Sequence, residues 1–405
     1  MAGNTLTSQP ISIDKRLAAR MGRLGTESAF EVLARAKALE AQGRRVIHLE
    51  IGEPDFATPE AVVEAGVRAL REGHTHYTPS PGIAPLREAV AAEMARSRGL
   101  VVSPEQVVVT PGAKPILFFV LLALIDHGDE VICPDPGFPI YESMIRYAGG
   151  VVVPAALPED NSFRLDIEAL RRAVTPRTKL IILNSPANPT GGVLDKEDLR
   201  RIAEVAVEHD LFVLADEIYS RLIYDGEHHS IAGFPGMAER TIILDGFSKT
   251  YAMTGWRLGY GVMPLGLVPH ISRLMVNSNS CTAGFTQLAG VEALTGDQTP
   301  VDRMRAEFRR RRDVIVGGLN ALPGVHCAMP SGAFYAFPNI TATGLTAKDL
   351  ADRLLNEAGV ATLAGSSFGP AGEGYLRLSY ANSVENIQEA LARMGNLLSG
   401  LAGGH

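Results

Sequence analysis

Short, almost wholly apolar segments recur along the middle of the chain and alternate with segments of helical periodicity. The apolar segments are VVVT at 107–110, EVIC at 130–133, VVVP at 151–154, KLIILN at 179–184, LFVLAD at 211–216 and TIILD at 241–245. Between two of them, DKEDLRRIAEVAVEHD at 195–210 has the spacing of an amphipathic helix. Strands this apolar are buried on both faces, which indicates a mainly parallel sheet covered by helices. The pattern therefore predicts an α/β core.

Both ends of the chain depart from this pattern. After Pro300 the stretch VDRMRAEFRRRRDVIVGGLNAL has the pattern of a long basic amphipathic helix. A chain of 405 residues also exceeds what a single core comfortably fills. We expect a large domain over 47–296 and a smaller α+β domain assembled from 14–46 and 297–405, with residues 1–13 as a loose N-terminal arm.

Composition and charge exclude several classes of protein. The formal net charge of -7 provides no general attraction for nucleic acid or for anionic membranes. Cys133, Cys281 and Cys327 are far apart, which indicates neither a disulfide framework nor a zinc site and fits reduced thiols in the cytoplasm. The longest apolar run, at 116–125, is too short to span a bilayer and indicates a buried helix. We therefore expect a cytoplasmic protein without nucleic-acid or membrane partners.

Polar residues follow four of the predicted strands, at the edge of a parallel sheet where ligands bind. PGAK follows the first strand and precedes an apolar helix, whose free backbone N–H groups suit a phosphate. The later strand ends carry Asn188 in NSPANPTGG, Asp216 and Tyr219 in DEIYS, and Lys249 and Arg257 in DGFSKTYAMTGWRLGYG. Each signal alone has an ordinary explanation as a turn, a helix cap or a loop lysine.

Taken together, these strand ends match the needs of one cofactor, pyridoxal phosphate. Its aldehyde requires a lysine amine, and its ring nitrogen requires an anion if it is to stay protonated. Its phenolic oxygen requires hydrogen-bond donors, and its phosphate requires a cation and a cradle of backbone N–H groups.

The chain resembles the class I aminotransferases of the pyridoxal-phosphate fold type I, in the branch that includes aspartate, aromatic and alanine aminotransferases. The resemblance covers nearly the whole chain, in order, through IGEPDFATP, YTPSPG, PGAK, DPGFPIY, NSPANPTGG, DEIY, FSKTYAMTGWRLGYG, SGAFYAF and YLRLSYA. It implies a mainly parallel sheet of the seven-stranded type covered by helices, with a smaller α+β domain formed from both chain ends.

The resemblance also implies roles for the residues around the cofactor ring. Lys249 matches the family's catalytic Schiff-base lysine, and Asp216 matches the catalytic carboxylate that pairs with the ring nitrogen. Asn188 and Tyr219 match the donors to the phenolic oxygen, Tyr219 being part of the catalytic set. Phe138 falls where the family stacks an aromatic ring on the cofactor.

Two further sets of residues follow from the resemblance. The phosphate cradle would comprise the backbone and side chains of Ala113, Lys114, Ser248 and Arg257, together with Tyr77 reaching across from a partner subunit. The substrate site would comprise Arg377, which clamps the α-carboxylate, the backbone of Gly52, and Asn188.

The activity implied is that of an aminotransferase, which moves an amino group from an L-amino acid to a 2-oxo acid, 2-oxoglutarate or pyruvate, by a ping-pong mechanism. The enzyme would be a homodimer with shared active sites. Other chemistry of the same fold (β-lyase, synthase or decarboxylase) stays open because the cofactor residues do not separate these reactions. A transcriptional regulator with an aminotransferase-like sensor domain is disfavoured because no room precedes residue 30 for a DNA-binding module.

The donor amino acid is not fixed by these residues. The helix after PGAK reads PILFFVLLALID, with no basic residue, which favours an apolar pocket and a neutral or aromatic donor. Aspartate remains possible through backbone or hydroxyl contacts.

Some conspicuous residues have ordinary explanations. His74 and His76 lack a nearby acidic or cysteine ligand, so no metal site is predicted. His228 and His229 have the surroundings of a surface loop. The run RRRR at 309–312 lies within the helical pattern and indicates a solvated or salt-bridged helix face.

Overall fold

A seven-stranded sheet forms the centre of the molecule in a computed structural model that describes residue 13 and residues 16–402. The strand order is β2-β8-β7-β6-β5-β3-β4. The strands are β2 (Val107–Thr110), β3 (Glu130–Asp135), β4 (Val151–Ala156), β5 (Thr178–Asn184), β6 (Phe212–Asp216), β7 (Thr241–Gly246) and β8 (Gly259–Val262). All six predicted strands are present, and the predicted α/β fold is confirmed.

Strand β8 was not predicted, and it is the antiparallel member of the sheet. It pairs antiparallel with both β2 and β7, whereas the other neighbours pair in parallel. Its sequence, GYGV, carries two glycines and so has no apolar run to predict a strand. Gly259 is required here because a Cβ would lie 2.4 Å from the backbone nitrogen of Ala113.

Helices cover both faces of the sheet, as the period-two pattern of buried strand residues requires. On β5, Ile182 packs with α4 (Lys114–Leu124), α5 (Ile140–Ala148) and α8 (Val268–Asn279). Its neighbour Ile181 faces the opposite side. That side is covered by α2 (Glu60–Arg71), α3 (Ala84–Arg98), α6 (Ile167–Ala173), α7 (Lys196–Glu208) and α9 (Gly284–Thr295). The sheet and these helices are called the main unit below.

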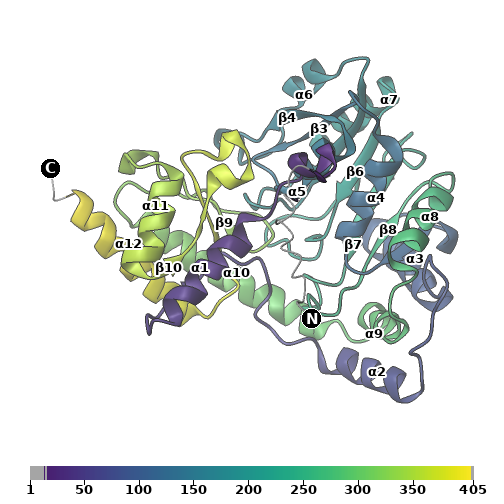
Figure 1. The fold of residues 1–405 in the computed structure, drawn as a ribbon, viewed down its shortest axis with the longest axis horizontal. Helices are drawn as coiled ribbons and strands as arrows, with labels where there is room; N and C mark the ends of the chain where they lie inside the picture. Colours follow the sequence, from purple (N-terminus) through teal and green to yellow (C-terminus); the bar gives the residue numbers. More distant parts are fainter. Residues whose placement is uncertain (1–12, 14–15, 403–405) are drawn as a thin grey trace, which may run out of the picture.

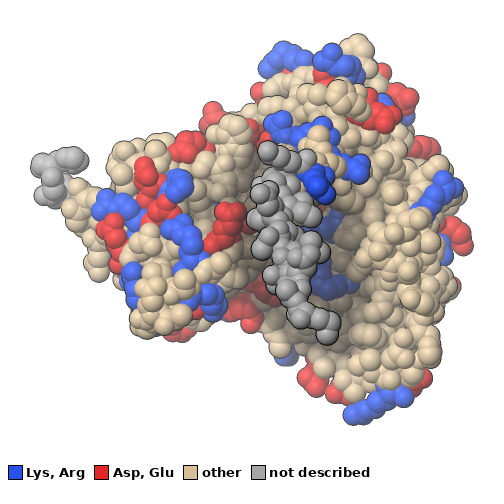
Figure 2. Space-filling view, viewed as in Figure 1, with Lys and Arg blue, Asp and Glu red and all other residues tan. Residues whose placement is uncertain are grey.

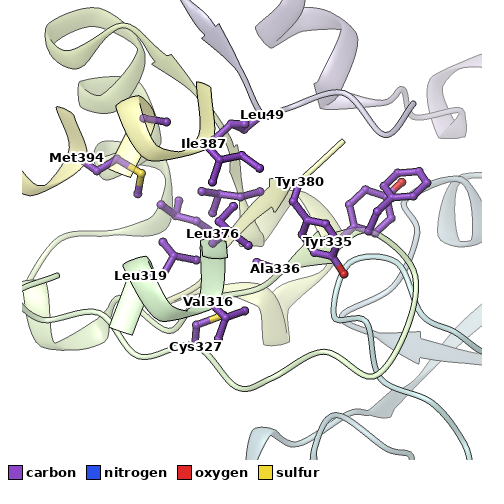
Figure 3. Close-up of a cluster of buried hydrophobic side chains, with 14 of the residues drawn as sticks. Leu49, Val316, Leu319, Cys327, Tyr335, Ala336, Leu376, Tyr380, Ile387 and Met394 are labelled. Atoms are coloured by element: carbon purple, nitrogen blue, oxygen red, sulfur yellow. The ribbon is translucent and has the colours of Figure 1, made fainter. Parts of the chain in front are cut away.

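A small unit lies to the left of the sheet in Figure 1. It contains α1 (Ser28–Glu40), β1 (Ile47–His48), α10 (Thr299–Asn320), β9 (Tyr335–Ala336), α11 (Ala347–Arg353), β10 (Val360–Ala361), β11 (Leu363–Ala364), β12 (Leu376–Ser379) and α12 (Val384–Ala402). Figure 3 shows part of its core, in which Leu49, Leu319, Leu376 and Ile387 converge from four segments. The predicted basic helix after Pro300 is α10.

The N-terminal stretch contacts both units. The 3-10 helix Ala19–Arg23 packs on α5 of the main unit, and the Gly25 N–H donates to Ser143 Oγ at 2.8 Å. Helix α1 instead packs on β10 and β11 of the small unit. The domain limits at 47–296 and at 14–46 with 297–405 therefore stay a prediction, and the arm at 1–13 lies, except for residue 13, outside the described residues.

The described surface is of mixed charge. Acidic and basic side chains are interspersed over the face of both units shown in Figure 2. Within the described residues, no helix combines the length and the apolarity needed to cross a bilayer.

We expect Gly259→Ala to destabilise the protein by about 1–3 kcal/mol. The added methyl group would overlap with backbone atoms, which cannot rotate away as the end of a side chain can. The free energy of unfolding from urea titration measures this loss. Gly266→Ala is the matched control, since a Cβ there meets nothing within 4 Å. Equal stability of the two variants would contradict the proposed close approach of β8 to the Ala113 loop.

Candidate functional site

A cavity of about 550 Å³ lies at the carboxyl ends of the central strands, where the small unit meets the main unit. All the site residues predicted from the sequence line this cavity except Tyr77. They are Gly52, Ala113, Lys114, Phe138, Asn188, Asp216, Tyr219, Ser248, Lys249, Arg257 and Arg377. Tyr77 is 89% exposed, so the described chain does not bring it to the cavity.

Lys249 follows the end of β7 and points its amine into the cavity. Its Nζ donates a hydrogen bond to the carbonyl oxygen of Gly52 and lies 5.8 Å from the centre of the Phe334 ring. Burial lowers the pKa of Lys249 to about 8, and the charges of Arg377 and Lys114 act in the same direction against Glu53 and Glu27. Roughly a tenth of the amine is therefore neutral at pH 7, far more than for an ordinary lysine, and the neutral form is the one that a nucleophile or a base requires.

Asp216 ends β6 and is buried at the bottom of the cavity. Its Oδ2 accepts a hydrogen bond from the Tyr141 hydroxyl at 2.5 Å, and its Oδ1 accepts one from the Ile218 N–H at 3.3 Å. Burial raises the pKa of Asp216 to about 6, although these two hydrogen bonds oppose the rise. No α-helix follows Asp216 directly, so it is not the cap of one. Among the described residues, the hydrogen-bond partners of this carboxylate are a phenol and a backbone N–H, and a protonated ring nitrogen would supply a cation.

Asn188 and Tyr219 line the cavity together with Asp216 and Arg377. The Tyr219 and Tyr335 hydroxyls are 2.7 Å apart, and the Asn188 backbone N–H donates to Asn184 Oδ1 at 2.8 Å. Asn184 Nδ2 in turn donates to the Asp216 carbonyl oxygen at 3.1 Å. These bonds hold a phenol and an amide at one edge of the cavity.

Arg377, on β12, brings a guanidinium to the cavity from the small unit. One Nη donates to the Glu50 carbonyl oxygen, and the other lies 3.4 Å from Asn188 Oδ1. Among the described residues its Nε has no hydrogen-bond partner, although the side chain is buried. Burial lowers the pKa of Arg377. A buried guanidinium with a free donor suits the bidentate binding of a carboxylate.

The start of α4 forms an anion cradle with the loop after β7. Ala113, Lys114, Ser248 and Arg257 line it. Gly112 has a positive φ of 88°, and a Cβ there would lie 2.2 Å from Arg257 Nη2, so glycine allows the guanidinium to lie against the loop. The donors and cations at this helix N-terminus suit a phosphate.

Several lining residues were not assigned a role from the sequence. Tyr141 and Tyr335 fall inside motifs that were noted, but nothing in their spacing showed a phenol reaching Asp216 or Tyr219. Glu27 and Phe30 had no signal at all, because the entry of the N-terminal stretch into the cavity is decided by tertiary packing.

The donor set fits pyridoxal phosphate. An amine of lowered pKa, a buried carboxylate, a phenol with an amide, and a helix start with two cations surround one space. An aromatic ring, Phe138, lies beside them.

Comparison with known proteins gives the same picture. The family model "Aminotransferase class I and II" matches residues 44–394. The chain is 44% identical to aromatic-amino-acid aminotransferase 2 of Thermococcus litoralis, over 88% of this chain and 93% of that protein. It is 43% identical to the aspartate/prephenate aminotransferase of Thermus thermophilus, over 94% and 98% respectively. The structure of the Thermus thermophilus aspartate aminotransferase with maleate has a TM-score of 0.91 and 42% identity, covering 94% of this chain and 99% of that one.

Lys249 should titrate with a pKa of about 8 in the protein without ligand. Because only the neutral amine reacts, its labelling by acetic anhydride should rise with pH through this value, well below the pKa of about 10.4 of an ordinary lysine. Competitive labelling read by mass spectrometry gives the midpoint. Lys114→Met should raise it, since the Lys114 charge lowers the pKa of Lys249. A midpoint near 10 would show that the amine is solvated.

Proposed function

The chain belongs to the class I and II aminotransferases, which use pyridoxal phosphate, and from this we propose that its cavity takes neutral or aromatic L-amino acids as donors and 2-oxoglutarate as the main acceptor, in a ping-pong cycle. The observation that carries the proposal is the convergence of Lys249, Asp216 and Arg377 on one cavity.

We propose separate roles for Asp216, Lys249 and Arg377 in the reaction. When bound, pyridoxal phosphate supplies an aldehyde that bonds to amines and a ring that accepts the electron pair left when the substrate loses its α-proton. Asp216 would keep the ring nitrogen protonated. The neutral amine of Lys249 would take the α-proton of the substrate and deliver it to the carbon that carried the aldehyde, on the other side of the shared nitrogen. Arg377 holds the substrate α-carboxylate throughout.

The remaining residues bind and orient. In this proposal Asn188 and Tyr219 donate to the phenolic oxygen, while Phe138 packs on the ring. The backbone of Ala113 and Lys114, with Ser248 and Arg257, holds the phosphate. Gly52, whose carbonyl accepts from Lys249, closes over the substrate carboxylate once the amine has moved.

The substrate side chain would lie between an apolar wall and a cation. Phe30, Leu117 and Ile218 line the cavity together with Lys114. The expectation of an apolar pocket without a cation is incomplete, because Lys114 is the first residue of α4 and its Nζ pairs with Glu27. It also lies 5.4 Å from the centre of the Phe138 ring. We propose that the wall accepts aromatic donors and that Lys114 binds the distal carboxylate of 2-oxoglutarate.

This arrangement supports aspartate as a second candidate donor. The same cation that binds the distal carboxylate of an acceptor can bind that of a dicarboxylic donor, since both substrates of a ping-pong cycle occupy one cavity in turn. The relatives named above act, by their names, on aromatic amino acids and on aspartate or prephenate.

A homodimer with shared sites is also part of the proposal. Tyr77 matches a phosphate donor, yet it is exposed in the single chain. A tyrosine placed in this way can complete the cradle of a second copy. We further propose a cytoplasmic location, which the three free cysteines support.

A panel of amino donors at saturating 2-oxoglutarate tests the proposed specificity, with Lys114→Met as the informative variant. We expect transamination of phenylalanine or tyrosine by the wild type. The substitution should raise KM for 2-oxoglutarate and for aspartate by about tenfold, or about 1.4 kcal/mol. KM for the aromatic donor should change little. Lys348→Met is the control, because the Lys348 side chain is 75% exposed and does not line the cavity. An equal rise of KM for all substrates would place Lys114 in phosphate binding only.

Mixed dimers test the sharing of sites. Lys249→Ala homodimers should be inactive, and Tyr77→Phe homodimers should bind the cofactor more weakly. A mixed dimer has one site with both residues intact, so refolding the two variants together should restore about a quarter of wild-type activity at limiting cofactor, as random pairing of a twofold dimer predicts. A fully active monomer in sedimentation, or no recovery in mixed dimers shown to have formed, would contradict a shared site.

A further inference from the structure

A cluster of buried charged side chains lies next to Asp216, outside the cavity. It consists of Arg98 at the end of α3, Glu217 after β6, Asp245 on β7, and His228, and is called the Arg98 cluster below. The side chains of Arg98, Glu217 and Asp245 are 1%, 5% and 6% exposed. None of the four residues lines the cavity, so they do not touch a ligand there.

Arg98 bridges the two strand ends that carry the reacting groups. Its Nε donates to Glu217 Oε2 and one Nη donates to Asp245 Oδ2, both at 2.5 Å. Glu217 directly follows Asp216 in the sequence, and Asp245 lies four residues before Lys249. The guanidinium therefore ties the strand end that bears the carboxylate to the one that bears the lysine.

The remaining bonds of the cluster favour charged carboxylates. Glu217 Oε1 accepts from the Ser230 hydroxyl at 2.6 Å, and Oε2 lies 3.1 Å from His228 Nε2. The side chain of His228 is only 10% exposed, which corrects the expectation of a surface-loop histidine. Asp245 Oδ1 accepts from the Gly246 N–H at 2.7 Å. These hydrogen bonds favour the ionised form of each carboxylate, although burial outweighs them at Asp245 and raises its pKa.

The cluster contains two carboxylates and one guanidinium. Glu217 and Asp245 both pair with Arg98. Burial would raise the pKa of Glu217, but Arg98 and His228 outweigh it and lower the pKa to about 2. After burial, the charges of Asp245 and Glu217 also raise the pKa of Asp216. The charge of the cluster thus reaches Asp216.

Stability alone does not explain why these charged side chains are buried. Burying several charges costs more free energy than burying apolar side chains of the same size, even when the charges are paired. Here the buried charges lie beside the one carboxylate whose ionisation the chemistry needs, and they connect its strand to that of Lys249.

We propose that Arg98, Glu217, Asp245 and His228 are positioning residues for the reaction, which fix Asp216 relative to Lys249 and place a negative charge that favours positive charge on the cofactor ring. The proposal rests on the pyridoxal-phosphate dependence of the family.

Charge-removing variants of the same shape test the electrostatic part. Glu217→Gln and Asp245→Asn each remove one negative charge near Asp216. In the protein without cofactor, the Asp216 pKa measured by carbon-13 NMR should then fall by about half a unit or more. In the holoenzyme, the pH midpoint of the cofactor's visible absorbance should fall in the same direction, because a positive charge there loses stabilisation.

Glu130→Gln is the matched control. Glu130 is also a buried carboxylate paired with an arginine, Arg177, but it lies at the start of β3, at the opposite edge of the sheet. It should lower thermal stability without moving either titration. If the cluster variants lose stability as the control does and move neither titration, the cluster is structural and the proposal is overturned. Where one cluster variant does not fold, the other decides.

Arg98→Lys tests the positioning part. Lysine keeps the charge but cannot bridge two carboxylates as a planar fork does. The titration midpoints should stay near those of the wild type, while the dissociation constant of the cofactor, from equilibrium dialysis, should rise about tenfold. An unchanged dissociation constant in a folded variant would overturn the bridging role.

Discussion

Burial of ionisable side chains at the carboxyl edge of one parallel sheet is the constraint on which the rest of the site depends. Burial raises the pKa of Asp216 to about 6 and lowers that of Lys249 to about 8. Both shifts have the same cause, because a group removed from water favours its neutral form. The two groups that the proposed chemistry uses, a carboxylate and an amine, thus have pKa values shifted toward neutrality.

The sheet alone does not complete the site. Arg377 arrives on β12 of the small unit, and Gly52 arrives on the segment that follows β1. The segment around Gly52 is tied to Lys249 through one hydrogen bond and, through Glu50, to Arg377 through another. The run of arginines in α10 contributes to the same junction. Arg311 donates to Asp55 at 2.6 Å and lies 4.8 Å from the Phe56 ring. The run is salt-bridged throughout, with Arg309 and Arg310 exposed and Arg311 and Arg312 buried.

The small unit contributes residues to the site and also links their positions through its core. Its core packs Leu49, two residues from Ile51 of the cavity lining, against α10 and α12. Movement of this core relative to the sheet would carry Gly52 and Arg377 together. A site assembled from two packed units can in this way change its shape without disturbing the groups anchored on the strand ends.

Elements with strong local signals could be predicted from the sequence. Continuous apolar runs predicted six strands, since strands covered on both faces need such residues. The polar residues after four of these runs predicted the edge of the sheet at which Asp216 and Lys249 both line the cavity. Motif resemblance supplied Arg377 and Gly52. Features that depend on contacts between distant segments could not be predicted and emerge only from the packing of the folded chain. Strand β8 inserts between β2 and β7 without an apolar run, Tyr141 reaches Asp216 across 75 positions, and Glu27 enters the cavity to pair with Lys114. The Arg98 cluster belongs to this second group. Local pattern reports whether a residue is buried, but the partner that a buried charge finds is set by the packing of elements far apart in the chain.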